Sequence, residues 1–225
     1  MEIEGILLVR KPIGISSFKV VSEVRKHTKQ KRVGHAGTLD PFASGLLIIA
    51  LGRKYTKKIF TFQNLPKTYI VDLIFGIKTD TFDSFGKVEE FTEVQELPNV
   101  AAVLPEFLGE QWQYPPIFSA KKVNGKRLYE YARKGQEVEI KPNLVTFYDI
   151  KLLDYKYGFL PLYRIELKVS KGTYVRSFVH DLGVKVGLGA YAKDLVRTHI
   201  GEYSLTEALN FKDFSLESIR ENLIL

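Results

Sequence analysis

The segment GHAGTLDPFASGLLIIALG, residues 34–52, joins a glycine-rich loop to a continuous apolar run. Gly37 and Gly45 permit tight backbone paths and the close approach of another group. Pro41 disfavours a helical conformation for Asp40 and pushes it towards an extended one. The apolar run that follows predicts a buried segment. The segment therefore holds an aspartate on a stiff turn that leads directly into the core.

Two interpretations of Asp40 are open at this level. A carboxylate on a rigid turn, five residues after His35, has the form of a presented nucleophile or base. An Asp-Pro turn that merely joins two elements explains the same residues and, for the turn alone, is the commoner case. The glycines do not form a phosphate-binding P-loop, because no GK[ST] sequence follows them.

The flanking residues predict further regular elements. GILLVR at 5–10 is typical of a buried strand and ends at the turn sequence KPIG. Ser16 and Ser17 are suited to cap a helix in which three valines share one face. Alternation in KTYIVDLIF, residues 67–75, predicts a half-exposed strand, and the segment after it, rich in aspartate and threonine, predicts a loop.

The second half of the chain alternates between strand and helix patterns. Residues 98–109 are partly helical in pattern, and LVRTHIGEYSL, residues 195–205, predicts a last strand. A long insertion near 112–142 contains a strong Asn-Gly turn signal at 124–125 and a short helix that Gly135 closes. We expect one mixed α/β domain that carries this insertion.

Composition narrows the class of protein. The 225 residues include no cysteine, which excludes disulfides, thiolate metal sites and thiol nucleophiles, and four histidines, none at the spacing of helical metal ligands. No apolar run is long enough to span a membrane and the N-terminus is not a signal peptide, so we expect a cytoplasmic protein. The net charge is +7, with basic runs at 25–32, 53–58 and 121–127. Charge alone fits a polyanion-binding protein or a solvated basic face equally well.

Five blocks carry a resemblance to a known family, and they occur in the family's order: KPIGISSF, GHAGTLDPFASGLLIIALG, KTYIVDLIFGIKTDTFDSFG, YPPIFSAKKVNGKRLYEYARKG and SKGTYVRSFVHDLG. Together they resemble the TruB family of tRNA pseudouridine synthases over roughly residues 5–205. The resemblance implies the pseudouridine synthase fold, a central, mixed but largely antiparallel sheet flanked by helices, with residues 1–210 as the catalytic domain. In the family, the stretch at about 112–142 is a mobile thumb that closes on the T arm.

The resemblance also implies the reaction. Members convert uridine 55 in the tRNA T loop to pseudouridine, without cofactor or metal, after flipping the uridine out of the stack. Asp40 matches the family's catalytic aspartate. Its carboxylate attacks C1′, attacks C6 or removes a 2′ proton, and the sequence does not choose among these routes.

Further site residues follow from the same blocks. Arg176 matches the arginine that pairs with the catalytic aspartate and holds it ionised; a surface or phosphate-binding arginine is the competing interpretation. Tyr69 matches the tyrosine against which the flipped uracil stacks, although a tyrosine in an alternating strand is usually packing. His35 resembles the histidine that contacts the unstacked T-loop bases, by stacking more than by acid–base work.

Three residues have looser assignments. Lys11 matches a basic residue near the active site, but KPIG is equally a structural corner. Tyr174 and Leu195 are candidates for lining the uracil pocket, with ordinary core packing as the alternative. We expect a monomer whose partner is the tRNA T arm, with no obligate protein partner and no membrane.

Residues 211–225 are expected to be a short remnant, because many bacterial members continue into a C-terminal PUA-type RNA-binding domain that this sequence does not include in full. Three other functions remain as alternatives. One is a tRNA-binding or tRNA-folding chaperone on the same scaffold with little catalysis. Another is a metal-dependent nuclease or phosphatase that uses Asp80 and Asp83, although two carboxylates in a turn are more often hydrogen-bonded loop residues. The third is a guided-RNA relative that acts with protein partners.

Overall fold

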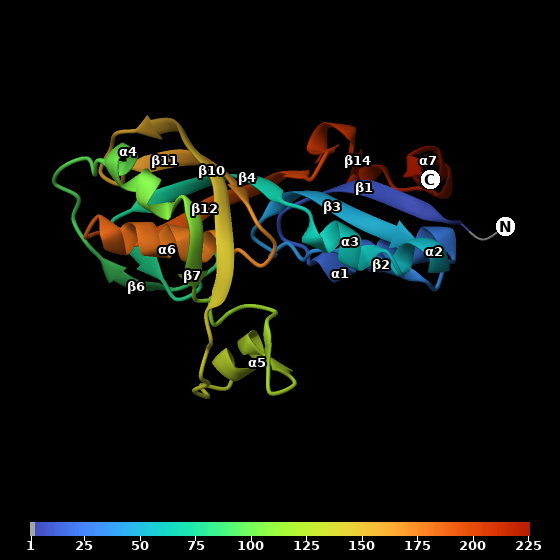
Figure 1. The fold of residues 1–225 in the computed structure, drawn as a ribbon, viewed down its shortest axis with the longest axis horizontal. Coiled ribbons are helices and arrows are strands. Elements are labelled where there is room, and N and C mark those ends of the chain that lie inside the picture. The colour runs from blue at the N-terminus through green and yellow to red at the C-terminus, as the bar shows by residue number, and fades with distance from the viewer. Residues whose placement is uncertain (1–2) are drawn as a thin grey trace. The chain divides into compact units, whose positions relative to one another are not determined.

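The computed structural model describes residues 3–225. They form two compact units: the first holds the residues up to Ile70 together with Leu195–Leu225, and the second is Val71–Asp194. Each unit is built of strands with helices packed against them (Figure 1). Within residues 3–225, no helix is both long enough and apolar enough to cross a bilayer.

The first unit is organised around the apolar run that was predicted to be buried, which forms a strand. This strand, β3 (Ser44–Leu51), pairs antiparallel with β1 (Gly5–Lys11) and with β2 (Val33–Ala36). Near Arg197 it pairs in parallel with β12 (Ala190–Ile200). The remaining short strands of this unit are β13 (Tyr203–Ser204), β14 (Leu209–Asn210) and β15 (Leu223–Ile224).

The helix predicted after KPIG is confirmed as α1 (Ser17–Thr28). Ser16 is its cap, because the side-chain oxygen of Ser16 accepts a hydrogen bond from the Lys19 amide at 3.1 Å. The valines of α1 are buried, as their shared face predicts. The other helical segments of this unit are α2 (Gly52–Thr56), α3 (Ile59–Asn64), η2 (Leu205–Glu207), η3 (Phe211–Asp213) and α7 (Leu216–Glu221).

Strand β3 is buried on both faces, which explains why its sequence is continuously apolar rather than alternating. Leu47 and Ile49 lie in a cluster with the α1 valines. Leu46 and Ile48 point the other way, into a cluster with Tyr55 of α2. Each cluster forms one half of the apolar core of this unit, and β3 lies between the two and contributes side chains to both.

The C-terminal residues belong to the first unit. Ile219 of α7 is fully buried in the cluster of the α1 valines, and Phe211 and Phe214 pack against it. Strand β15 pairs antiparallel with β1, where Ile224 lies opposite Ile6. The segment predicted as a remnant therefore completes the packing of this unit.

The second unit contains β4 (Lys67–Phe75), which begins in the first unit, and the strands paired beside it in the order β4-β11-β10-β7. Its core includes edge-on contacts between aromatic rings, such as Phe107 against Phe178 at 4.9 Å. The bounds of the other elements are β5 (Ile77–Thr79), β6 (Val88–Phe91), α4 (Val100–Val103), η1 (Leu104–Phe107), β7 (Gly109–Gln113), β10 (Asn143–Lys156), β11 (Leu162–Val169) and α6 (Val175–Lys185). The expected fold class, mixed α/β with a largely antiparallel sheet flanked by helices, is confirmed.

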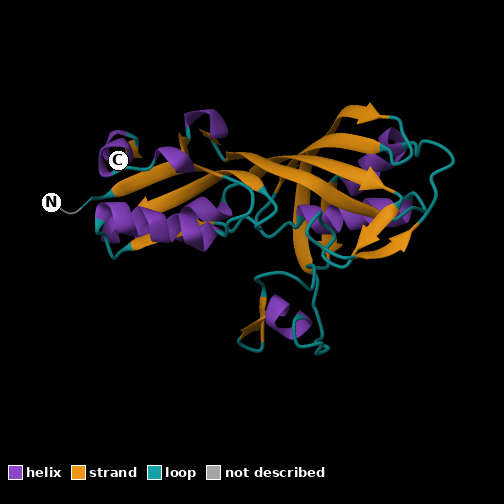
Figure 2. Cartoon of the chain, turned by 180° about the vertical axis from the view of Figure 1, so that it is seen from behind, coloured by secondary structure: helices purple, strands orange, loops and turns teal. Residues whose placement is uncertain are grey.

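Between β7 and β10, the chain leaves the sheet and returns. It forms a small hairpin of β8 (Lys122–Val123) and β9 (Lys126–Arg127), followed by α5 (Leu128–Ala132), and loops join these elements to their neighbours (Figure 2). Asn124 and Gly125 have φ of 50° and 81°, the left-handed pair that a two-residue hairpin turn requires. The turn predicted from Asn-Gly is therefore confirmed.

Two features differ from expectation, and a third was not predicted. β2 lies in the stretch expected to be a loop; it is four residues long and becomes a strand by pairing with β3. The basic run at 53–58, for which no element was predicted, contributes to α2, whose inward residue Tyr55 is buried. The last long strand, β12, begins at Ala190, five residues before the predicted start.

Candidate functional site

Hydrogen bonds fix the loop that carries Asp40 at the residues on either side of it. The Ser17 hydroxyl donates to the Leu39 carbonyl at 3.1 Å and accepts from the Leu39 amide at 2.9 Å. The Gly14 amide donates to the Pro41 carbonyl at 2.8 Å. The KPIGISSF segment thus holds the two neighbours of Asp40, and the half-buried Asp40 lies between two fixed points.

Arg197 holds the start of the same loop, and the sequence interpretation did not single it out. Its side chain is 1% exposed. The guanidinium donates to the carbonyls of Leu46 at 2.8 Å, Gly37 at 3.1 Å and Thr38 at 3.5 Å. Gly45 permits the backbone of β12 to approach β3 closely, since a Cβ there would lie 2.3 Å from the Arg197 carbonyl oxygen. The available signal was the alternation of β12, which places Arg197 on the same strand face as the buried Leu195.

Lys11 is a second buried cation of this cluster and is 0% exposed. Its ammonium donates to the carbonyls of Pro12 and Ile15, both at 2.8 Å. Burial lowers the pKa of Lys11 to about 8; the charge of Asp40 raises this pKa and that of Arg197 lowers it further. Lys11 therefore holds the KPIG corner and also interacts electrostatically with Asp40, so the two interpretations of this residue are compatible.

Tyr69, in β4, contacts the same arginine. Its hydroxyl lies 3.5 Å from Nη1 of Arg197, and the guanidinium carbon lies 6.0 Å from the ring centroid, within cation–π range. The ring is buried. Leu195, also buried, precedes Arg197 by two residues on β12. The first unit thus contains five of the predicted site residues, Lys11, His35, Asp40, Tyr69 and Leu195.

His35 lies on β2, opposite Ile49 of β3. Burial, and then the positive charge of Arg197, lowers the pKa of the imidazole. Its Nδ1 atom is buried without a hydrogen-bond partner among residues 3–225. A neutral ring of this kind is suited to stacking on a base more than to carrying a proton.

The remaining predicted residues, Arg176 and Tyr174, belong to the second unit. Arg176 is 3% exposed on α6 and donates to the carbonyls of Thr81 at 2.8 Å and Phe118 at 3.0 Å. Its Nη1 lies 3.5 Å from an oxygen of Asp83. Arg176 is therefore a buried, oriented guanidinium, and its pairing with Asp40 stays a prediction.

Tyr174 comes just before α6, and its backbone is held by one side chain. Its amide donates to Oε1 of Gln113 at 2.8 Å, and its carbonyl accepts from Nε2 of the same residue at 3.0 Å. Gln113 is buried at the end of β7, so this pair of bonds fixes the entry to α6. Whether the ring of Tyr174 lines a uracil pocket stays a prediction.

The aspartate-rich loop after β5 uses its carboxylates for internal hydrogen bonds. One oxygen of Asp83 accepts from the Thr81 hydroxyl at 2.7 Å and the Phe85 amide at 3.0 Å. Asp80 accepts from the Lys87 amide at 2.8 Å. Phe82 between them has φ of 60°. The loop is thus a tight structure that supports Arg176 through Thr81 and Asp83.

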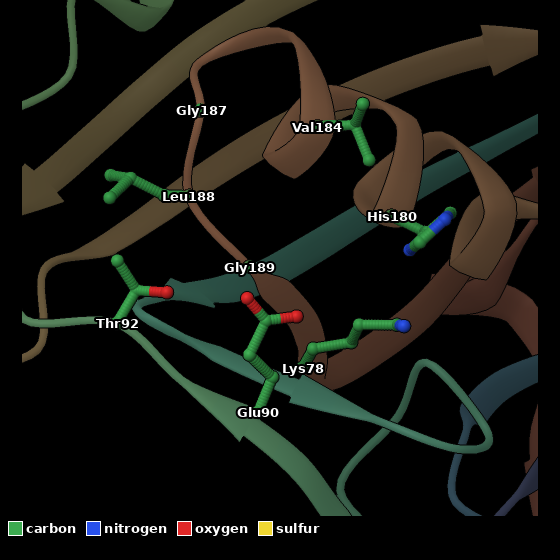
Figure 3. A pocket seen from close by; sticks show the side chains of 8 residues that line it. All are labelled: Lys78, Glu90, Thr92, His180, Val184, Gly187, Leu188 and Gly189. Atoms are coloured by element: carbon green, nitrogen blue, oxygen red, sulfur yellow. The ribbon is translucent and has the colours of Figure 1, made fainter.

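A cavity of about 220 Å³ lies elsewhere in the second unit, near the C-terminal end of α6 (Figure 3). It contains none of the predicted site residues. His180, on its wall, stacks on Phe82 with ring centroids 4.0 Å apart. Burial and the nearby Lys78 lower the pKa of His180. The cavity is lined by Lys78, Glu90, Thr92, His180, Val184, Gly187, Leu188 and Gly189.

Known proteins resemble this chain over most of its length. A protein of Dehalococcoides mccartyi named tRNA pseudouridine synthase B is 43% identical over 93% of this chain and 69% of its own length. Its namesake from Aquifex aeolicus is also 43% identical, over 99% of this chain and 77% of its own length.

A solved structure has the same fold. It is an H/ACA RNP bound to a substrate RNA containing 2′-deoxyuridine, and it matches 93% of this chain with a TM-score of 0.66 and 25% identity. The chain spans about half, 51%, of the length of that structure's matched chain. Residues 25–175 match the family described as TruB family pseudouridylate synthase (N terminal domain). This chain belongs to the TruB family of pseudouridylate synthases.

Proposed function

We propose that this chain isomerises uridine 55 in the T loop of tRNAs to pseudouridine, with Asp40 as the catalytic carboxylate and no cofactor. Family membership supports the reaction class. The relatives named tRNA pseudouridine synthase B support tRNA as the substrate. The single observation that supports the catalytic assignment is the clamped loop, which holds Asp40 between Leu39 and Pro41 beside Lys11.

A clamped carboxylate suits each possible first step. Attack at C1′, attack at C6 and removal of a 2′ proton all need a carboxylate oxygen held at one position against the ribose or base. The bonds from Ser17, Gly14 and Arg197 supply this positioning before the substrate arrives. The Lys11 ammonium adds a cation beside the carboxylate. The loop therefore supplies orientation and charge for whichever route operates.

The other proposed roles concern the flipped nucleotide. Tyr69 provides an aromatic face for the uracil, and its hydroxyl is oriented towards Arg197. Tyr174 and Leu195 line the same base, and His35 stacks against an unstacked neighbour in the loop. Arg176 pairs with the Asp40 carboxylate, through the guanidinium that Asp83 and Thr81 orient. Removing a base from its stack costs a few kcal/mol, which these contacts offset.

The insertion at about 112–142, which contains the β8–β9 hairpin and α5, serves as the thumb that grips the RNA in this proposal. Arg127 and Arg133 lie 5.7 Å and 5.2 Å from the ring of Tyr129, and Lys126 lies 5.9 Å from that of Tyr131. Cations held beside aromatic rings are suited to contact phosphates and exposed bases of a folded RNA. We further propose that the enzyme works in the cytoplasm as a monomer, without an obligate protein partner.

Incubation with an unmodified T-arm hairpin, followed by mapping of pseudouridine, tests the function. The native protein is expected to convert the loop uridine, whereas Asp40→Asn is expected to bind the hairpin and leave it unmodified. Asp213→Asn, which removes an exposed carboxylate of the same unit, is the control and should retain activity. No product from native protein in excess over RNA would reject the function; product from Asp40→Asn would reject only the catalytic assignment.

A further inference from the structure

Two basic stretches that lie more than twenty residues apart in sequence meet at one end of the first unit. The Gly52 amide, at the start of α2, donates to the Arg32 carbonyl at 2.9 Å. Val33 of β2 also pairs with Leu51 of β3, which fixes the two stretches side by side. The exposed cations gathered there, which we name the basic corner, are Lys29, Lys31, Arg32, Arg53, Lys54, Lys57 and Lys58.

The basic corner contains seven cations, a number equal to the net charge of +7. The sequence has 33 lysines and arginines, and the 26 outside the corner match the 26 acidic residues. Within residues 3–225, no salt bridge joins a corner cation to a carboxylate. Glu4, the nearby acid, accepts a hydrogen bond from the Lys54 amide. The corner therefore presents a large excess of positive charge to solvent, with Glu4 as the acid beside it.

The backbone that carries the corner cations is held in place by buried and hydrogen-bonded residues. Tyr55 is buried beneath them, and the ammonium groups of Lys54 and Lys58 lie 5.2 Å and 5.6 Å from its ring centroid. The Arg25 guanidinium donates to the Val33 carbonyl at 2.8 Å and so ties α1 to β2 below the loop. Supports that are already ordered reduce the entropy that is lost when a ligand binds.

The elements of the first unit set the distance from this corner to Asp40. Strand β3 starts at Ser44, close after Asp40, and ends at Leu51, where α2 begins (Figure 1). Eight extended residues span about 25 Å. Helix α1 runs the same way, because it starts at Ser17, bonded to Leu39, and ends beside Lys29. The corner and the Asp40 loop thus lie at opposite ends of the same unit.

We propose that the basic corner binds the phosphates of the RNA helix that continues from the loop holding the target uridine. This inference rests on the proposed function. A span of about 25 Å corresponds to at least about seven base-pair steps, because A-form RNA rises less per step than the about 3.4 Å of B-form DNA, and it lies beyond the reach of a single flipped nucleotide. The corner offers cations for a sugar–phosphate backbone, and Tyr55, the ring that lies beside two of them, is buried and cannot stack on a base.

The test compares two RNA hairpins that share the same T loop and differ in stem length, about three and about ten base pairs. Arg53→Glu combined with Lys57→Glu reverses two corner charges on exposed side chains. Lys156→Glu combined with Lys168→Glu makes the same change in charge on exposed residues of the second unit. Dissociation constants are measured over a series of salt concentrations, with single-turnover rates at saturating protein.

For the long stem, the corner variant is expected to bind about tenfold more weakly than the native protein. The slope of log affinity against log salt should fall by about two, one for each lost phosphate contact. For the short stem, native protein and corner variant should bind alike. The control variant should match the native protein on both, and the single-turnover rate on the short hairpin should not change.

Equal losses of affinity for both hairpins would overturn the inference. They would show that the corner attracts RNA through its overall charge and does not contact the distal part of the stem. No loss on either stem would also overturn it. Binding of anionic lipid vesicles by native protein as tightly as the long stem would assign the corner to a membrane surface instead. If native protein forms no pseudouridine in either hairpin, the proposed function is rejected. The inference about the corner is tested separately, because the stem-length comparison measures binding alone.

Discussion

Arg197 connects most of the residues around Asp40. Its planar guanidinium donates hydrogen bonds to the carbonyls of Gly37, Thr38 and Leu46. The same group lies near the ring of Tyr69. A guanidinium can make these bonds at once because its donors point in fixed directions, which the single ammonium of a lysine cannot reproduce. Arg197 acts on Asp40 through the loop, so it is a positioning residue.

Arg197→Lys is expected to keep the positive charge and to lose the several N–H donors of the guanidinium. Buried carbonyls left without donors should lower the free energy of unfolding by about 2 kcal/mol or more. Displacement of the Asp40 loop should lower kcat roughly 10- to 100-fold, with little change in hairpin affinity. Chemical denaturation and single-turnover kinetics measure the two effects. Arg53→Lys, an exposed exchange in the same unit, is the control, and a kcat equal to that of the native protein in Arg197→Lys would contradict the positioning role.

Lys11 makes stability depend on pH in a predictable direction. Its pKa is about 8 in the folded protein and 10.5 when solvated. Between these values the unfolded chain binds more protons than the folded one, so folding stability rises with pH. The free energy of unfolding of the native protein minus that of Lys11→Met should therefore rise above about pH 8. Both values are measured by denaturant unfolding from pH 7 to 10.5. A difference that stays flat over this range would show that Lys11 is not desolvated.

Among the elements, the start of α1 has two neighbouring serines with separate tasks. Ser16 caps the helix, and Ser17 clamps Leu39. Ser17→Ala should lower the free energy of unfolding by about 1–2 kcal/mol and kcat roughly tenfold, because the clamp beside Asp40 is lost. Ser16→Ala should lower stability by about 1 kcal/mol and leave kcat unchanged. Equal kcat values for the two variants would show that the clamp has no catalytic role.

The strongly patterned elements were predictable from sequence and the weakly patterned ones were not. The burial of the apolar run that forms β3 and the helix with the valine face that forms α1 were both predicted, and both are confirmed. β2 is too short to show a pattern and exists because β3 is beside it. Arg197 was missed because an arginine in a strand is usually exposed, and only the tertiary structure shows its side chain buried. Asp40 was identified through resemblance, since its turn alone favoured a structural role.

At the scale of the whole molecule, the predicted site residues are divided between the two units. Asp40 and Tyr69 belong to the first, and Arg176 and Tyr174 to the second. Strands β4 and β12 each contain residues of both units, so the covalent connection between the units is made by extended backbone. Each unit orients its own groups through its own hydrogen bonds, as Arg197 and Asp83 illustrate.

Chelation distinguishes the carboxylate reaction from a metal-dependent one. An ion at Asp80 and Asp83 would have to displace the Lys87 amide, the Thr81 hydroxyl and the Arg176 guanidinium. Pseudouridine formation on a short hairpin, which folds without divalent ions, is therefore expected to continue at an unchanged rate in EDTA. Loss of product in EDTA, with recovery on adding Mg²⁺, would contradict this expectation.

The burial of β3 on both faces affects how often this strand is exposed to solvent. Its backbone amides are expected to exchange with deuterated solvent only when the first unit opens as a whole, because no local fluctuation exposes a strand enclosed by two apolar clusters. The Asp40 loop leads directly into the start of this strand. Its shape should therefore persist from one turnover to the next, without reassembly at each encounter with RNA.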